Sequence, residues 1–309
     1  MEVLVLGGSR FVGLRLVKLL VEKGHQVSTL NRGRQRQPFD VDQIVADRRR
    51  PQQVRDALER GKFDVAFDIS AYKPSDTVPA VDALEGRVDR FIHLSTAAVY
   101  NPKVELPWRE DSTRSATAVW GDYASNKIRC ESFLFKAHEE RGFPAVILRP
   151  PYVYGPHNYL YREAYFFDRI EAGRPLLIPD GDAVLQLSHV DDLAMAFLAA
   201  ATRSGTEGEA INVAGEDPLT FGELAAYAGD AVGADARLVP VGDRHEIESL
   251  FPFGNFSLLV DLSKARNILA LRPRTMKDGL RDTYEWYEGE RPFGPPDFSE
   301  DDRLLKGRV

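Results

Sequence analysis

The first half of the chain alternates short segments rich in apolar residues with longer amphipathic segments. The short apolar runs have the length of strands in a parallel sheet, and those at 3–6 and 145–148 are apolar throughout, which is typical of strands buried on both faces. The runs occupy residues 3–6, 26–30, 41–46, 64–68, 90–94 and 145–148. Amphipathic segments at residues 14–23 and 120–141 have the length and periodicity of helices. This regular alternation predicts an α/β fold, with a doubly wound parallel sheet.

The first apolar run leads into a glycine-rich turn and then into a helix. Early glycines permit a tight turn and a close approach to a pyrophosphate, and a last glycine lets the helix pack closely on the sheet. The helix start adds amide donors and the positive end of its dipole. A purely structural turn is the alternative. In this context we predict a dinucleotide site, formed by Gly7, Ser9, Arg10, Phe11, Val12 and Gly13.

The second apolar run ends at Asn31-Arg32-Gly33-Arg34. A carboxylate at this position would bind the adenosine ribose diol of NAD and repel a 2'-phosphate. Asn31 is neutral, whereas Arg32 can offer a planar fork to a phosphate, with Arg10 and Arg34 close by. We therefore predict a preference for NADP over NAD. The alternative is a solvated arginine loop.

Small and polar residues follow the next three apolar runs. Asp47 can accept a hydrogen bond from an adenine amino group or cap a helix. Ser70 and Ala71 are small enough to let a cofactor pass. Ser95 and Thr96 place two hydroxyls at the carboxyl edge of the sheet, where open parallel sheets bind ligands. A structural cap is the alternative for these hydroxyls, and we expect all five residues at the site.

Tyr123 and Lys127 lie four residues apart within the long helical segment. Both side chains therefore leave the same face of a helix and can reach one substrate atom. A tyrosine hydroxyl is a poor base at neutral pH, but an ammonium group beside it favours the phenolate. This spacing is common in helices without any function. The glycine turn and the hydroxyl pair that precede it make Tyr123 a candidate acid and base.

The composition favours a protein that acts on small molecules. The net charge of -7 argues against a general nucleic-acid surface, and the run Arg48-Arg49-Arg50 is expected to be a solvated face. The single cysteine, Cys130, excludes an internal disulfide and is expected to pack in the core of a cytoplasmic protein. Neither a signal peptide nor a membrane span is predicted. His189 with Asp191 and Asp192 could form a metal cluster, but we predict no metal site, because the two aspartates open an apolar helix whose start they stabilise.

Regular structure is interrupted at residues 149–156, after which elements shorten and Gly and Pro are frequent. We predict a first lobe at residues 1–155, to which residues 186–214 return. The second lobe comprises residues 156–185 and 215–309. Its last segment, 289–309, is either an ordered wrap over the core or a frayed tail.

Four motifs follow one another along the chain: residues 7–13, Ser95-Thr96, Tyr123-x-x-x-Lys127 and Arg149-Pro-Pro-x-Val-Tyr-Gly-Pro156. Together with segments at 188–194, 211–215, 265–273 and 279–287, they resemble the extended short-chain dehydrogenase/reductase superfamily, in its NAD-dependent epimerase/dehydratase branch. The likeness covers most of residues 1 to 290. It is specific for the superfamily and unspecific for the substrate.

The resemblance implies a Rossmann-type cofactor lobe with a smaller C-terminal α/β substrate lobe. It implies that Thr96 hydrogen-bonds the substrate oxygen and that Tyr123 is the base. Lys127 would hold the nicotinamide ribose and depress the pKa of the tyrosine. As Tyr123 takes the hydroxyl proton, hydride would pass to C4 of the nicotinamide.

Other positions of the motifs imply further contacts and an assembly. Pro150 and Val153 are expected to contact the cofactor, and Tyr152, His157 and Gln186 the substrate. For Gln186 the alternative is that it satisfies buried backbone groups. The superfamily commonly forms a homodimer through a four-helix contact, which we expect here.

The chain departs from the family pattern at several positions. Arg10 replaces the middle glycine, a variant seen in atypical members that include relatives of chloroplast stem-loop RNA-binding proteins. Tyr152 and Leu185 stand where UDP-galactose 4-epimerase and its relatives have an asparagine and an arginine that contact the sugar nucleotide. Each missing contact is worth about 1–3 kcal/mol, which puts a standard UDP-hexose in doubt. Ala97-Ala98 replace the Asp-Glu pair of hexose 4,6-dehydratases.

The sequence thus predicts an NAD(P)-dependent epimerase or oxidoreductase that acts on a secondary alcohol or ketone of a sugar, a nucleotide sugar or a nucleotide-like substrate. The Ala97-Ala98 pair favours an epimerase, and Arg32 favours an NADPH-dependent carbonyl reductase. A hypothesis of another class is a non-catalytic cofactor- or RNA-binding scaffold. Arg10 and the arginines at 32, 34, 36 and 48–50 motivate it, whereas the negative charge and an intact Thr96, Tyr123 and Lys127 argue against it.

Overall fold

The computed structural model describes residues 1–35, 37–59, 61–242 and 247–306 of the 309-residue chain. The chain divides into two compact units. The first comprises residues 1–151, 190–214 and 260–272, and the second comprises residues 152–189, 215–259 and 273–309. Arg36, which the RNA-binding hypothesis invoked, lies outside the described residues.

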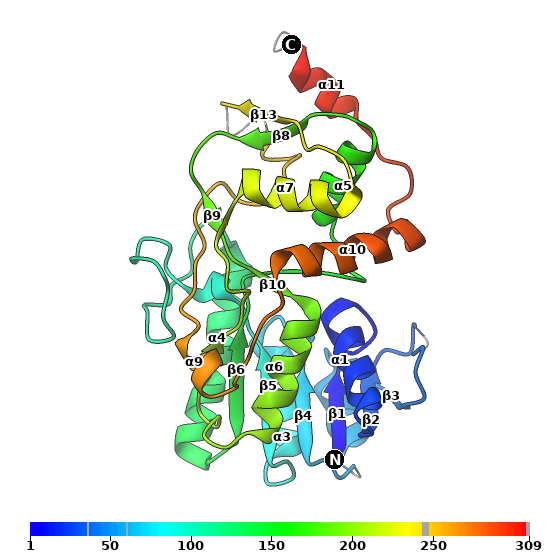
Figure 1. Cartoon of the computed structure of the whole chain (residues 1–309). Helices are drawn as coiled ribbons and strands as arrows, with labels where there is room; N and C mark the ends of the chain where they lie inside the picture. The colour runs from blue at the N-terminus through cyan, green and yellow to red at the C-terminus, as the bar shows by residue number, and fades with distance from the viewer. Residues whose placement is uncertain (36, 60, 243–246, 307–309) are drawn as a thin grey trace. The chain divides into compact units, whose positions relative to one another are not determined.

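A seven-stranded parallel sheet forms the centre of the first unit (Figure 1). Its strand order is β11-β6-β5-β4-β1-β2-β3, so the chain winds outward in both directions from β1 and β4. This is the strand order of a Rossmann fold, with β11 added at one edge. The strands are β1 (Glu2–Leu6), β2 (Gln26–Asn31), β3 (Asp42–Val45), β4 (Val65–Asp68), β5 (Arg90–Leu94), β6 (Ala145–Arg149) and β11 (Ala210–Asn212).

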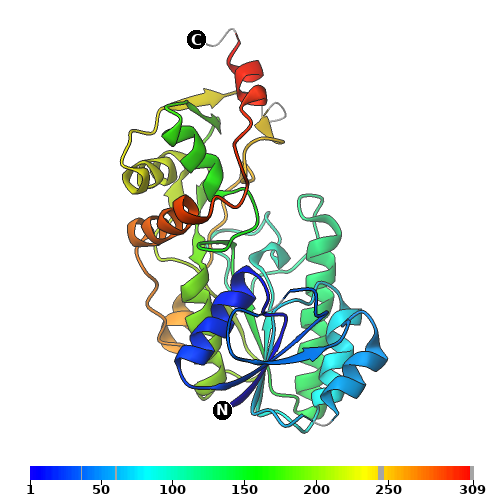
Figure 2. The same ribbon diagram turned by 90° about the vertical axis from the view of Figure 1, so that its right-hand side faces the viewer.

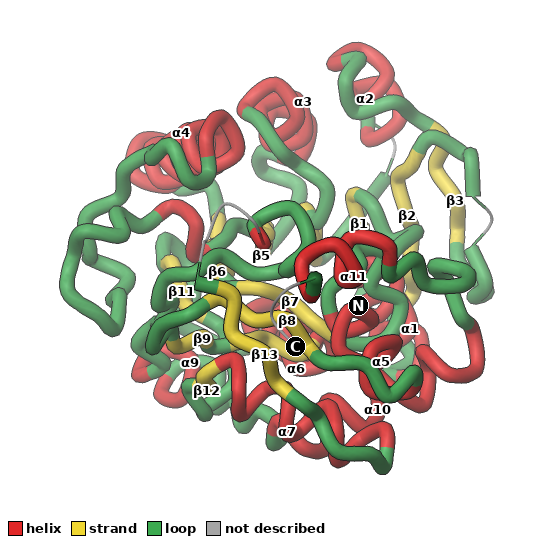
Figure 3. Tube along the Cα trace, turned by 90° about the horizontal axis from the view of Figure 1, so that it is seen from above, coloured by secondary structure: helices red, strands yellow, loops and turns green. Residues whose placement is uncertain are grey.

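Helices cover both faces of this sheet, as the side view and the view from above show (Figures 2 and 3). One face carries α1 (Phe11–Glu22) and α6 (Val190–Thr202), which pack on each other. The other carries α2 (Pro51–Leu58), α3 (Pro74–Leu84) and α4 (Gly121–Arg141). The predicted doubly wound sheet is therefore confirmed. The short helices η1 (Ala97–Val99) and α9 (Ser263–Asn267) complete this unit.

The second unit joins short strand pairs to helices around an aromatic core. Its strands pair as β10 (Leu187–His189) with β7 (Tyr152–Tyr154), β12 (Leu219–Thr220) with β9 (Val184–Leu185), and β13 (Leu238–Val241) with β8 (Leu176–Pro179). Its helices are α5 (Glu163–Glu171), α7 (Phe221–Val232), α10 (Met276–Glu290) and α11 (Ser299–Leu305). Rings of Phe166, Phe221, Phe251 and Phe253 pack edge to face or stacked.

The C-terminal segment is an ordered wrap as far as residue 306. Asp301 of α11 is fully buried and accepts two hydrogen bonds of 2.7 Å from Arg169 of α5. Residues 260–272 pack in the first unit, whereas the sequence placed them with the second lobe. The reason is long-range pairing, because Val260 bridges to Trp108 and Asn212 donates to the carbonyl of Asp261.

Candidate functional site

The glycine turn lies at the point where the direction of winding changes. It follows β1, whose neighbours in the sheet are β2 and β4. Gly7 and Gly8 have φ angles of +127° and +93°, which favour glycine. A Cβ on Gly7 would lie 3.3 Å from the side chain of Ser70, which follows β4. The turn and the end of β4 therefore form one surface at the carboxyl edge of the sheet, where open α/β sheets bind ligands.

Gly13 shows why this turn fits a dinucleotide. The predicted helix begins earlier than expected, at Phe11, so Gly13 lies inside its first turn. A Cβ on Gly13 would lie 2.6 Å from the amide nitrogen of Gly8, which is closer than a side chain can approach without a shift of the backbone. Among the described residues no side chain caps this helix, and its first turn has no acidic residue. The amide-lined start of α1 thus suits an anionic pyrophosphate.

The loop that follows β2 has neutral and basic groups. The Oδ1 atom of Asn31 accepts hydrogen bonds from the amide of Gly33 and from Gln43, at 2.8 and 2.9 Å. Arg32 and Arg34 are exposed. Arg10 is linked to this loop by a long hydrogen bond of 3.4 Å to Gln35. The predicted proximity of Arg10 to the loop is confirmed.

The segment after β3 corrects one expectation. Arg48 is not a solvated residue of a charge run, because its side chain is 14% exposed and forms a 2.8 Å ion pair with the buried Asp68. Arg48 also donates to the hydroxyl of Ser70, at 2.6 Å. Arg49 is exposed and pairs with Asp47, so the Asp47 carboxylate does not cap α2, whose cap position is Arg50. An adenine contact of Asp47 stays a prediction.

Lys127 lies one helical turn after Tyr123 on α4 and is buried at 3% exposure. Its Nζ atom donates to the carbonyl of Ala71, at 2.8 Å, and to the carbonyl of Leu94. These carbonyls lie just after β4 and at the end of β5. Tyr123 is 38% exposed, and its ring lies 6.3 Å from that of Tyr72. Lys127 is thus anchored at the sheet edge, one helical turn after a more accessible tyrosine.

Burial lowers the pKa of Lys127 to about 8, although the charge of Asp68 opposes this effect. The ammonium form therefore predominates at neutral pH. Thr96 caps η1, since its hydroxyl accepts a 3.2 Å hydrogen bond from the amide of Ala98. As an acceptor in that bond it keeps its own proton for a ligand oxygen. The helix η1 packs against α4, which brings Thr96 to the helix that carries the other two residues.

A buried ionic network supports this edge of the sheet. Glu131, one turn after Lys127, is fully buried and accepts two hydrogen bonds from Arg149, at 2.8 and 2.9 Å. Burial would raise the pKa of Glu131, but the charge of Arg149 outweighs it and the pKa is lowered. The hydroxyl of Ser95 donates to the same carboxylate at 2.5 Å. Its side chain thus holds β5 to α4, and its cofactor contact stays a prediction.

The remaining predicted residues belong to two different units. Pro150 is buried in the first unit, where its carbonyl accepts from the amide of Ala97 at 2.8 Å. The other four lie in the second unit. The hydroxyl of Tyr152 accepts from the amide of Gly254, His157 packs on the ring of Trp286, and Gln186 donates to the carbonyl of Gly215. Val153 pairs with Ser188. Their ligand contacts stay predictions.

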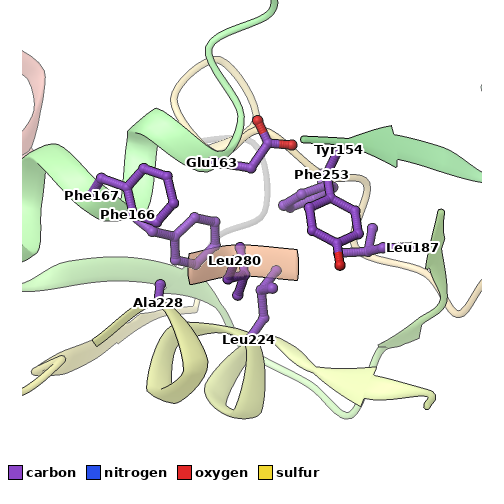
Figure 4. A pocket seen from close by; sticks show the side chains of 9 residues that line it. All are labelled: Tyr154, Glu163, Phe166, Phe167, Leu187, Leu224, Ala228, Phe253 and Leu280. Atoms are coloured by element: carbon purple, nitrogen blue, oxygen red, sulfur yellow. The ribbon is translucent and has the colours of Figure 1, made fainter. Parts of the chain in front are cut away.

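The second unit also encloses a small cavity, with aromatic and aliphatic walls (Figure 4). It has room for about one water molecule, which is too little for a sugar. The carboxylate of Glu163 lies at its edge and accepts hydrogen bonds from Asn158, at 3.0 and 3.2 Å. Burial raises the pKa of Glu163 to about 7. The lining residues are Tyr154, Glu163, Phe166, Phe167, Leu187, Leu224, Ala228, Phe253 and Leu280.

Sequence reasoning missed three buried ionisable residues beside Lys127. Glu131 carries a helical signal, because it follows Tyr123 and Lys127 at the same spacing of four. Asp68 and His93 each interrupt an apolar strand, which marks them as polar groups that need buried partners. Cys130 is buried as predicted, and Asp191 lies in the first turn of α6 and pairs with Arg15 at 2.6 Å.

The chain is similar to known proteins in sequence and in fold. A family model described as "NAD dependent epimerase/dehydratase family" matches residues 3–214. The chloroplast stem-loop binding protein of 41 kDa b from Arabidopsis thaliana is 31% identical, over 100% of this chain and 85% of its own. The dTDP-glucose 4,6-dehydratase of Streptomyces niveus is 29% identical, over 68% of this chain and 60% of its own. The structure of UDP-glucose 4-epimerase from Thermotoga maritima aligns with a TM-score of 0.80 at 21% identity, covering 94% of this chain and 100% of the epimerase.

Proposed function

The chain belongs to the NAD-dependent epimerase/dehydratase family, and on that premise we propose that it transfers hydride at a secondary alcohol or ketone of a sugar, a nucleotide sugar or a nucleotide-like substrate. The anchoring of Lys127 carries this proposal. The fold alone does not need a buried ammonium between the ends of β4 and β5, one helical turn after an accessible tyrosine, because an apolar side chain would fill the same space without desolvating a charge.

In the proposed reaction each residue has one role. Thr96 donates its hydroxyl proton to the substrate oxygen and orients it. Tyr123 removes the proton from the substrate hydroxyl, or returns it to a ketone. Lys127 stabilises the phenolate by its charge and offers donors to ribose hydroxyls. A bound nicotinamide would supply the hydride acceptor at C4.

We favour an epimerase, in which hydride returns to the same molecule. Ala97-Ala98 lack the acidic pair that hexose 4,6-dehydratases use to eliminate water, and both alanines are buried in η1. The reductase alternative requires that the cofactor be exchanged after each turnover. Denaturing the purified protein and identifying its retained cofactor distinguishes the two. Retained cofactor supports an internal hydride cycle, and an empty protein that oxidises added NADPH supports a reductase.

We propose NADP as the preferred cofactor, with NAD as the alternative. The end of β2 has Asn31 in place of a carboxylate, and Arg10 and Arg32 are basic neighbours of the same loop. Titration of the protein with NADPH and with NADH, followed by nicotinamide fluorescence, tests this preference. Tighter binding of NADH would overturn it.

The second unit gives little support for a standard UDP-hexose. Leu185 is buried in β9, and Tyr152 presents its hydroxyl to a backbone amide and its ring to Arg162, 4.9 Å from the ring centre. Neither supplies the amide or guanidinium contacts of UDP-galactose 4-epimerase. We therefore propose another sugar, nucleotide sugar or nucleotide-like substrate.

A Tyr123→Phe variant tests the catalytic assignment. The hydroxyl is the only group removed, so the variant should bind NADPH as the wild type does and lose turnover by at least about a hundredfold. The substrate of that assay comes from screening sugars and nucleotide sugars for a change in nicotinamide absorbance. Unchanged turnover in the variant would end the proposal that Tyr123 is the base.

A second candidate function is RNA binding. The Arabidopsis relative, whose name is that of a stem-loop binding protein, matches this chain over its whole length, and Arg32, Arg34, Arg49 and Arg50 are exposed. The net charge of -7 disfavours it. Stem-loop RNA binding that weakens steeply with salt, in a protein without turnover on any sugar tested, would favour it over the enzyme.

Assembly and location are proposals as well. We propose a homodimer in the cytoplasm, which acts on a small molecule and binds neither nucleic acid nor membrane in its main function. Within the part of the chain that the structure describes, none of the helices combines the length and the apolar character of a bilayer crossing. Sedimentation of the purified protein tests the dimer.

A further inference from the structure

Two buried ionisable residues face each other directly beneath Lys127. Asp68 ends β4 and His93 lies in β5, and the register of the two strands places them side by side. Both are fully buried. The Oδ2 atom of Asp68 lies 3.0 Å from Nδ1 of His93, and the Oδ1 atom forms the ion pair with Arg48. The Nε2 atom of His93 lies 3.4 Å from Nζ of Lys127.

The charges in this row determine which nitrogen of His93 carries the proton. Burial alone would raise the pKa of Asp68, but Arg48 and His93 outweigh it and lower the pKa to about 2, so the carboxylate only accepts. Burial and the charge of Lys127 lower the pKa of His93, which is therefore neutral. Nδ1 must then carry the proton and donate it to Asp68. Nε2 has a lone pair directed at an ammonium that only donates.

Lys127 thus has three acceptors for its three protons: the carbonyls of Ala71 and Leu94, and His93. The two carbonyls do not titrate, whereas the acceptor on His93 exists only while Asp68 holds the tautomer. Among the described residues, the charged and titratable groups near Lys127 include Asp68 from β4, His93 from β5, Tyr123, Cys130 and Glu131 from α4, and Arg48 from the segment after β3.

We propose that Asp68 and His93 are positioning residues for Lys127. Asp68 fixes the tautomer of His93, and His93 holds the lysine protonated and oriented at the sheet edge. The proposal deepens the proposed function, on which it rests for its role in hydride transfer.

The test measures the ionisation of Lys127 in cofactor-free protein by NMR of ε-¹³C-labelled lysine. The signal of Lys127 is assigned by its absence in Lys127→Met. In Asp68→Asn the amide oxygen stays with Arg48, which only donates, so the amide nitrogen faces Nδ1 of His93 and reverses the tautomer. Nε2–H then meets the ammonium. His93→Phe removes the acceptor, whereas His93→Gln keeps an acceptor oxygen near the position of Nε2.

We expect the titration midpoint of Lys127 to fall by about one pH unit or more in Asp68→Asn and His93→Phe. His93→Gln should restore it toward the wild-type value. The control His138→Phe removes a half-buried histidine at the other end of α4 and should leave the midpoint unchanged. Circular dichroism establishes that each variant is folded. If Asp68→Asn does not fold, the comparison of His93→Phe with His93→Gln decides the test.

Equal midpoints in the wild type, His93→Phe and His93→Gln would overturn the proposal, as would a fall in His138→Phe of the same size. This result is independent of the enzymatic proposal, because no substrate or cofactor is present. Absent NADPH and NADH binding in wild-type protein would instead overturn the proposed function and leave the measured coupling in place.

Discussion

Replacing Lys127 by methionine should reveal the free energy stored in its buried charge. Burial lowers the pKa of this lysine from 10.5 to about 8. In the unfolded chain the side chain stays protonated up to about pH 10.5, so between these values the unfolded state binds more protons than the folded state. The free energy of unfolding of the wild type must therefore rise with pH across this window, relative to a variant without the lysine.

The lowering of the pKa corresponds to about 3 kcal/mol in total, since each unit is worth about 1.4 kcal/mol. Between about pH 7.5 and 9.5 the linkage relation releases about 2 kcal/mol of this penalty. Methionine has a similar length and no charge, so the carbonyls of Ala71 and Leu94 lose their donor equally at both pH values. This constant loss cancels when the two pH values are compared.

Urea unfolding followed by circular dichroism measures the effect. The stability of wild type minus that of Lys127→Met should increase by about 2 kcal/mol from pH 7.5 to 9.5. The control Lys277→Met removes a lysine whose side chain is 58% exposed and which loses little solvation on folding, so its difference should change far less. A constant or falling difference for Lys127→Met would show that the buried ammonium is not destabilised in the fold.

Three other substitutions test the cofactor turn, the cofactor preference and the second unit. Gly13→Ala should cost about 1–3 kcal/mol of stability and weaken NADPH binding at least about tenfold, because its Cβ would lie 2.6 Å from the backbone of the turn. The control Gly289→Ala should do neither in the same thermal and fluorescence assays, because no atom lies within 4 Å of its added Cβ. Arg32→Ala should weaken NADPH binding about tenfold and leave NADH binding unchanged. An equal loss for both cofactors, or the same loss in Arg55→Ala, would show that Arg32 does not contact the 2'-phosphate. Burial raises the pKa of the Glu163 carboxyl from 4.5 to about 7, so the unfolded chain releases its proton first and wild-type stability should fall by about 3 kcal/mol between about pH 4.5 and 8. Glu163→Gln should remove this fall, and parallel urea-stability profiles of the two proteins would contradict it.

Most of the first unit could be predicted from local patterns. The strands β1 to β6 occur where the sequence predicts strands, and β1 and β6 are the most apolar of them. The glycine turn could also be predicted, because a strand, a turn of small residues and a helix are adjacent in sequence. The start of α1 was placed three residues late, since nothing in the sequence indicates that Phe11 adopts a φ of +40° at the first helical position. The second unit, with short strands and few periodic segments, offered no comparable signal.

The sequence by itself determined the order of strands and helices, the cofactor turn and the spacing of Tyr123 and Lys127, because each depends on residues close together in the chain. Only the tertiary structure decided which charges are buried and what they contact. Arg48 looks like its exposed neighbours, yet it pairs with Asp68, and Asp68 meets His93 only because β4 and β5 pair in one register. The physical reason is that the cost of burying a charge depends on partners brought together by the fold, and these partners are separated by tens of residues in the chain.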